Sequence, residues 1–154
     1  MHLKGHEGTE LRLDIRGYQF PTNEGDGWDA NWLVVEIEAT CEEGRWERTD
    51  PRLTVAEAQD LVAWLQSIAE DSDPPHELEF TEPNLRFHWE LVDSGNVQVR
   101  VYFELEVRPP WSPSDAVGPP DFWINITVSR DRLLAASHAL GDQLRRFPAR
   151  GYGS

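Results

Sequence analysis

The sequence is poor in cysteine and in positive charge. Cys41 is the only cysteine among 154 residues, so neither an intramolecular disulfide nor a zinc finger built on cysteine pairs can form. Fourteen Lys and Arg residues stand against 28 Asp and Glu residues, which gives a net charge of −14. Nucleic acids and anionic membranes are bound by clustered cations. The composition therefore argues against both as direct partners and favours a basic protein.

Long apolar runs and the common catalytic motifs are also missing. No stretch approaches the ~18 apolar residues of a membrane-spanning helix, and the first residues lack the apolar segment of a signal peptide. We therefore expect a cytoplasmic location. There is no phosphate-binding glycine loop, no Gly-x-Ser-x-Gly and no His-Glu-x-x-His. These absences exclude several large enzyme classes, and we expect no metal ligands.

Core-forming residues are plentiful by contrast. Hydrophobic residues make up 39% of the chain, and seven of them are tryptophan. A chain of this size buries roughly two thirds of its unfolded surface. No polar low-complexity linker divides it, so we expect one domain over residues 1–154.

Alternating apolar and polar residues predict most of the chain to be strands. The longest alternation, over residues 97–107, places six apolar side chains on one face, and Asp93 to Asn96 predict a hairpin just before it. The prolines of residues 109–120 exclude a strand or helix there. The predicted strands cover residues 9–17, 31–40, 45–49, 77–82, 85–92, 97–107 and 122–128.

Two helices are predicted from their capping residues and their apolar stripes. Thr54 and Glu57 have the spacing of a capping box, and the apolar residues after them recur at three and four positions until residue 69. Ser129 can cap a second helix, which Pro148 follows. With helices at about 55–69 and 130–146, the fold class is α+β, with a mostly antiparallel sheet packed on two helices.

Several groups of residues could carry chemistry, and each has a plainer interpretation. Glu104 and Glu106 lie two apart in a predicted strand, about 7 Å from each other, which suits either two-carboxylate hydrolysis or a solvated sheet face. His88 and Glu90 form the His-x-Glu of zinc deaminases, but the Cys-x-x-Cys partner is absent. The loop at residues 23–29, which holds Asp26, lacks the full calcium-loop pattern.

Tryptophans in or beside loops leave two kinds of binding open. Trp28, Trp111 and Trp123 could stack on a sugar, or could anchor a protein interface. The sequence does not separate these two interpretations. Trp46, Trp64 and Trp89 are expected to pack in the protein interior.

A set of short segments, taken in order, resembles the WapI-type immunity proteins of bacteria. The resemblance covers about residues 10–150. It implies a cytosolic antidote with no catalytic residues and no cofactor, which binds the toxic C-terminal domain of a contact-delivered toxin. In the best-known relatives that domain cleaves tRNA. The segments are Gly17-Tyr18-Gln19-Phe20-Pro21, Trp28-Asp29-Ala30-Asn31-Trp32-Leu33, Asp50-Pro51, Trp64-Leu65, Phe80-Thr81-Glu82-Pro83-Asn84-Leu85, Val101-Tyr102-Phe103-Glu104, Arg108-Pro109-Pro110-Trp111 and Phe147-Pro148.

The leading hypothesis is therefore an immunity protein whose acidic surface binds and neutralises a basic, tRNase-like nuclease toxin. A small-molecule or carbohydrate-binding domain built on the Trp-rich loops is the second hypothesis, and an isolated family member with another role stays open. An enzyme using Asp26 and Asp29, or Glu104 and Glu106, is the third. The expected partner-binding residues are Asp26, Trp28, Asp29, Glu36, Glu38, Glu104, Glu106 and Trp111.

Overall fold

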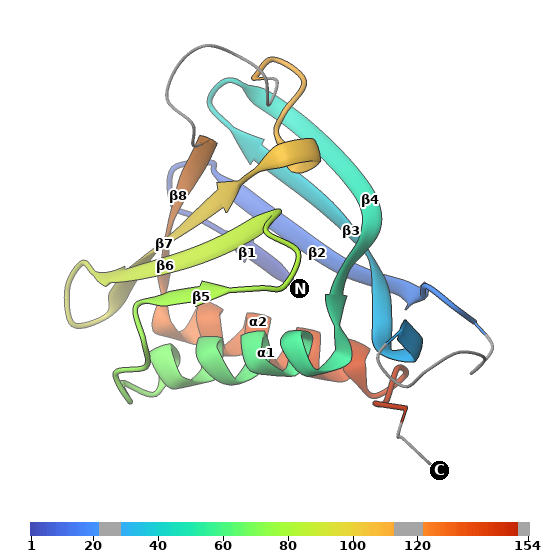
Figure 1. Cartoon of the computed structure of the whole chain (residues 1–154). Helices are drawn as coiled ribbons and strands as arrows, with labels where there is room; N and C mark the ends of the chain where they lie inside the picture. The colour runs from blue at the N-terminus through green and yellow to red at the C-terminus, as the bar shows by residue number, and fades with distance from the viewer. Residues whose placement is uncertain (22–28, 113–121, 151–154) are drawn as a thin grey trace.

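A computed structural model describes residues 1–21, 29–112 and 122–150 of the chain. Two antiparallel sheets of four strands each lie over a pair of helices that run side by side (Figure 1). The predicted α+β class and the mostly antiparallel pairing are confirmed. The strands form two sheets, however, where the sequence pattern indicated one.

The first sheet, sheet A, contains β1 (His2–Lys4), β2 (Glu10–Tyr18), β3 (Trp32–Cys41) and β4 (Gly44–Thr54) in that order, with a short 3-10 helix η1 (Asp29–Asn31) before β3. The prediction that this last strand covers only residues 45–49 is wrong, because β4 continues through Asp50-Pro51 to Thr54. A bulge places Pro51 opposite Val34 and Leu53 opposite Leu33. Proline is tolerated here because β4 is an edge strand, where a missing N–H need not break a ladder.

The second sheet, sheet B, contains β5 (Glu77–Glu79), β6 (Leu85–Leu91), β7 (Asn96–Phe103) and β8 (Phe122–Ser129). The prediction that one strand continues to Val107 is wrong. The chain leaves the sheet after Phe103 and forms a second 3-10 helix, η2 (Leu105–Val107). Leu105 has a φ of 55° and is 50% exposed, so it does not continue the inward apolar row.

The last strand of each sheet is followed directly by a helix. Helix α1 (Val55–Ala69) begins at Thr54, whose side chain accepts a hydrogen bond from the Glu57 N–H while the Glu57 side chain accepts one from the Thr54 N–H. Helix α2 (Arg130–Leu144) begins at Ser129, which caps the Arg132 N–H. Both predicted helices are confirmed, although α2 ends two residues before the predicted residue 146.

The two halves of the chain thus share one arrangement: four antiparallel strands and then a helix of 15 residues. The two sheets meet at one edge through the turn after β1. There the His6 N–H donates to the Thr127 carbonyl at 3.1 Å, and the Thr9 hydroxyl donates to the Asn125 carbonyl at 2.8 Å. The free edge of β8 is therefore partly covered by the start of the chain.

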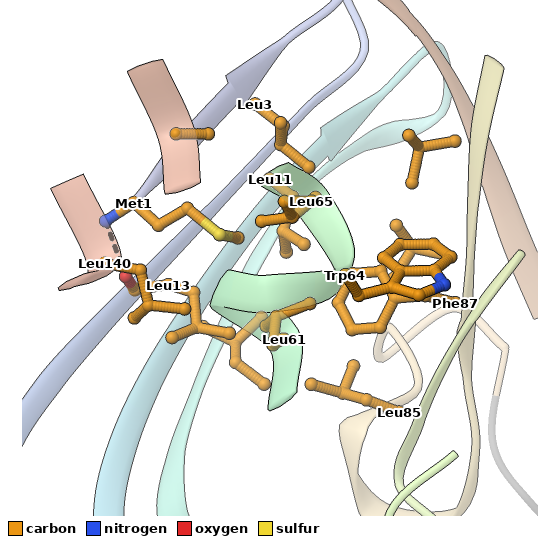
Figure 2. Close-up of a cluster of buried hydrophobic side chains, with 14 of the residues drawn as sticks. Met1, Leu3, Leu11, Leu13, Leu61, Trp64, Leu65, Leu85, Phe87 and Leu140 are labelled. Atoms are coloured by element: carbon orange, nitrogen blue, oxygen red, sulfur yellow. Dashed lines mark hydrogen bonds between the residues drawn. The ribbon is translucent and has the colours of Figure 1, made fainter. Parts of the chain in front are cut away.

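Apolar side chains from both sheets and both helices form one buried cluster (Figure 2). Leu11 and Leu13 point inward from β2, Leu65 comes from α1, and Phe87 comes from β6. Each of these four side chains is completely buried. Trp46, Trp64 and Trp89 are also buried, as predicted. No helix in the described part of the chain is long and apolar enough to cross a bilayer.

Candidate functional site

The edge strand β4 of sheet A is hydrogen-bonded to η2 and Arg108, the segment that follows strand β7 of sheet B, and this contact forms a seam between the sheets. The Trp46 indole N–H donates to the Val107 carbonyl at 2.9 Å. Arg48 donates from Nε to the Glu106 carbonyl at 3.0 Å and from a terminal nitrogen to the Arg108 carbonyl at 3.1 Å. The carbonyls freed where the chain leaves β7 are thus satisfied by side chains of β4.

A hollow of about 430 Å³ lies beside this seam. Its carboxylates come from four separate segments: η1, β4, the connection between β5 and β6, and η2. We call it the acidic hollow. It is lined by Gln19, Phe20, Asp29, Trp32, Asp50, Pro51, Glu82 and Glu106.

Three of these carboxylates differ in how they are partnered. Asp50 accepts a hydrogen bond from Arg52 at 2.8 Å and forms an ion pair with it. Glu106 accepts a hydrogen bond from the neutral amide of Asn84 at 3.0 Å. Glu82 is exposed and has no ion pair with any residue that the structure describes. The hollow therefore keeps a local excess of negative charge.

Arg52 is the buried cation beside the hollow. It occupies the β4 bulge with only 1% of its surface exposed. Burial lowers the pKa of its guanidinium, and the nearby charges of Asp50 and Glu106 oppose that shift. Its Nε and one terminal nitrogen, like Oδ1 of Asn84, have no hydrogen-bond partner in the described part of the chain. Unused polar atoms at such depth are uncommon in proteins and retain hydrogen-bonding capacity.

Aromatic rings complete the lining. Phe20 is 40% exposed and Trp32 is half-buried, so both keep ring surface near the carboxylates. Carboxylates bind guanidinium and ammonium groups through charge-assisted hydrogen bonds, and aromatic faces attract the same cations. The chemistry of the hollow suits an arginine or lysine side chain and disfavours phosphate.

The predicted residues Glu36 and Glu38 lie elsewhere, on the outer face of sheet A. Each is matched by an arginine: Arg16 binds Glu36 at 2.8 Å, and Arg45 binds Glu38 at 2.6 Å. The hydrogen bonds that Arg16 donates to Glu36 raise the pKa of the Arg16 guanidinium. This face carries five carboxylates against three arginines and Lys4 of β1, so its surplus charge is small. The residues on it include Glu10, Arg12, Asp14, Arg16, Glu36, Glu38, Arg45 and Glu47.

Glu104 and Glu106 do not share one face of a strand, and that prediction is wrong. The left-handed backbone at Leu105 turns the chain between them. Glu106 lines the acidic hollow, whereas Glu104 lines a smaller pocket of about 230 Å³ and lies 3.5 Å from Arg86. The strand geometry proposed for two-carboxylate hydrolysis is therefore absent at this pair.

Trp111 packs edge-on against Trp46, with ring centroids 5.4 Å apart, and remains 39% exposed. Its ring lies over Gly44, where an added Cβ would come within 3.1 Å of it. Trp111 thus covers the end of the seam. Asp26 and Trp28, with most of the loop at residues 23–29, lie outside the described residues.

The structure brings two predicted residues, Asp29 and Glu106, into one hollow. Sequence reasoning missed Asp50 and Glu82, which share it. The sequence pattern predicts that a strand ends just before Asp50, and no local pattern connects Asp50 with Glu82, which lies 32 positions further along the chain. Only the Asp50-Pro51 dipeptide, which marks the bulge, hinted at irregular backbone there.

The described architecture defines a small α+β protein with two antiparallel sheets joined at a carboxylate-lined seam. The model of the immunity protein WapI-like family matches residues 2–148, and the chain belongs to this family. An immunity family implies a cognate toxin as binding partner, and such families are generally non-catalytic. The comparison with curated proteins found no match.

Proposed function

We propose that this chain is a non-catalytic immunity protein that binds and neutralises a basic, tRNase-like nuclease toxin in the cytoplasm. The acidic hollow receives a cationic side chain from the phosphate-binding surface of the toxin, with Glu82 and Glu106 facing that cation and Asp29 and Asp50 beside them. Family membership supports a toxin partner, and the net charge of −14 supports a basic one.

The physical argument rests on what any nuclease needs. A nuclease binds its polyanionic substrate through clustered Lys and Arg residues. An inhibitor with carboxylates at matching positions can occupy the same cations and exclude RNA. Its negative field also steers the two proteins together and raises the association rate.

One observation carries the choice of surface. On the outer face of sheet A, Glu36 and Glu38 are each paired with an arginine, whereas Glu82 has no such partner among the described residues and Glu106 is bound by a neutral amide. A carboxylate that already has a cation gives little to a second one. Among the described residues, the carboxylates of the hollow are therefore less neutralised by nearby cations than those on the outer face of sheet A.

A pair of matched double variants tests this location. Glu82→Gln/Glu106→Gln removes two charges from the hollow, and a glutamine oxygen at position 106 can still accept the Asn84 hydrogen bond. Glu36→Gln/Glu38→Gln removes two charges from sheet A. The probe is a toxin C-terminal domain that this chain neutralises when the two are co-expressed, and stopped-flow mixing at low salt measures association. We expect the hollow pair to slow association by about tenfold and the sheet pair to change it less than twofold.

The opposite pattern would overturn the location: if the sheet A pair slows association and the hollow pair does not, the outer face of sheet A is the binding surface. A second assay addresses the toxin itself. The isolated toxin domain should cleave tRNA, and an equimolar amount of this chain should stop the cleavage. Binding without any effect on a nuclease reaction would contradict the proposed mechanism.

A further inference from the structure

A cluster of two histidines and one glutamate lies on the outer face of sheet B, apart from the acidic hollow. His88 and Glu90 are two residues apart on β6, so both side chains point to the same face. His76 precedes β5 and is joined to the same strand, because its carbonyl accepts the Trp89 N–H at 2.9 Å. One ligating atom from each of the three residues lies within 4.8 Å of the other two.

The orientation of His76 is set by two contacts. Its Nδ1 lies 2.8 Å from the Trp89 carbonyl, and a carbonyl can only accept a hydrogen bond, so Nδ1 carries the proton. The ring also stacks on the Trp89 indole, with centroids 4.5 Å apart and planes 8° from parallel. Nε2 of the neutral ring is then a lone-pair donor. A histidine held by a carbonyl through its other nitrogen is the usual arrangement in metal sites.

His88 lies between two carboxylates. Its Nε2 is 2.8 Å from Glu90, and its Nδ1 is 3.6 Å from Glu77 on the neighbouring strand. A metal ion placed between Nε2 and Glu90 would replace their mutual hydrogen bond. Glu77 could then hold the Nδ1 proton, as carboxylates do for metal-bound histidines.

The charges around the cluster permit a cation. Arg100 faces His88 across the sheet, but its Nε donates to Asn125 at 2.9 Å and its guanidinium lies over the Trp123 ring at 5.2 Å. Its contacts thus draw it toward β8. A small pocket of about 110 Å³, lined by His88, Glu90, Gln98 and Arg100, adjoins the cluster and leaves room for a water ligand.

We propose that His76, His88 and Glu90 form a binding site for Zn²⁺, with water as the fourth ligand. Two imidazoles and one carboxylate are a donor set that zinc accepts in tetrahedral geometry. Ligand atoms around such an ion are about 3.3 Å apart. Small shifts of the exposed Glu90 and half-buried His88 side chains can close the difference from 4.8 Å while His76 keeps its contacts with Trp89.

Titration calorimetry of the metal-stripped chain with ZnCl₂ tests this site. We expect one Zn²⁺ per chain, at least tenfold weaker binding in His76→Ala, His88→Ala and Glu90→Gln, and no change in His138→Ala, which removes an exposed histidine from α2. Glu77→Gln should weaken binding by about tenfold. Co²⁺ should give the visible absorption of a four-coordinate ion.

Circular dichroism of each variant checks that the fold is intact, which is expected because these side chains face outward. Absence of binding, or equal loss in His138→Ala, would overturn the site. So would Glu90→Gln binding Zn²⁺ as tightly as the unaltered chain. None of these outcomes depends on the toxin, so the metal site and the proposed immunity function can fail separately.

Discussion

Single side chains explain why the seam has its shape. Trp46 lies at the centre: its ring packs against Phe103, Trp111 and Phe122, with centroids 4.9, 5.4 and 5.6 Å away, and its N–H is bonded across to η2. The sequence predicted correctly that Trp46 is packed. It could not predict the partners, because they are distant in the chain and meet only when both sheets have formed.

Asp93 shows how one exposed carboxylate sets a turn. It accepts hydrogen bonds from the Gly95 N–H at 2.8 Å and from the Asn96 side chain at 3.1 Å, within the hairpin between β6 and β7. The Gly95 N–H and then the Asn96 side chain favour the ionised form and hold the pKa of Asp93 below its ordinary value of 3.8. A carboxylate of lowered pKa stabilises the fold above its unfolded pKa, and this contribution is lost as the pH falls through the folded pKa.

Asp93→Asn keeps an acceptor oxygen and removes the charge, so it isolates this effect. We expect the variant to have a lower urea midpoint than the unaltered chain at pH 7, and the gap to shrink progressively below about pH 3.8. Urea unfolding followed by circular dichroism at pH 7, 5, 4 and 3 measures it. A gap that stays constant down to pH 3 would contradict a role for the charge.

Elements with strong local signals were predicted well, and elements that depend on tertiary contacts were not. Both helix starts follow from Thr54 and Ser129, whose capping is local. The end of β7 does not follow from its pattern, because Leu105 and Val107 continue the alternation that the backbone abandons. Likewise, β1 is only three residues long and has too little pattern to recognise.

The two helices are linked at one end by Arg130, the first residue of α2. Its guanidinium donates to the Ile68 carbonyl in the last turn of α1 and to the Ser94 carbonyl, and lies 3.4 Å from Asp71. Helix C-termini carry unsatisfied carbonyls and partial negative charge, so a cation there is stabilising.

Arg130→Ala removes this link. We expect the free energy of unfolding to fall by about 1–2 kcal/mol, measured by urea denaturation. Arg145→Ala is the control next to the same helix, since Arg145 is 82% exposed and its one ion pair with the described residues is to Asp142. A loss below about 0.5 kcal/mol is expected there. Equal losses in the two variants would show that general charge, and not the cap on α1, is responsible.

At the scale of the whole molecule, the candidate site was the hardest feature to predict. Net charge and family resemblance indicated a basic partner, but the acidic hollow joins residues 29, 50, 82 and 106, which no sequence window contains. Cross-strand arginines neutralise Glu36 and Glu38, and this pairing depends on the strand register. The charge of a surface follows from the folded arrangement and not from the count of acids alone.

The shared core leads us to predict one cooperative folding unit. The hydrophobic cluster includes side chains from both sheets and both helices, so neither half buries its apolar surface without the other. Thermal unfolding followed by far-ultraviolet and by near-ultraviolet circular dichroism should give the same midpoint. Two separated transitions would mean that the chain contains two domains.

The edges of the two sheets affect how readily the protein aggregates at high concentration. An exposed, regular strand edge is a template on which other chains can add and form fibrils. Here β1 and β5 are only three residues long, β4 contains Pro51 and is bonded to η2, and β8 gives two carbonyls to the turn after β1. These short or partly covered edges disfavour amyloid-like growth when the protein accumulates in a cell. They also leave little room for strand addition, so we expect its partners to recognise side chains.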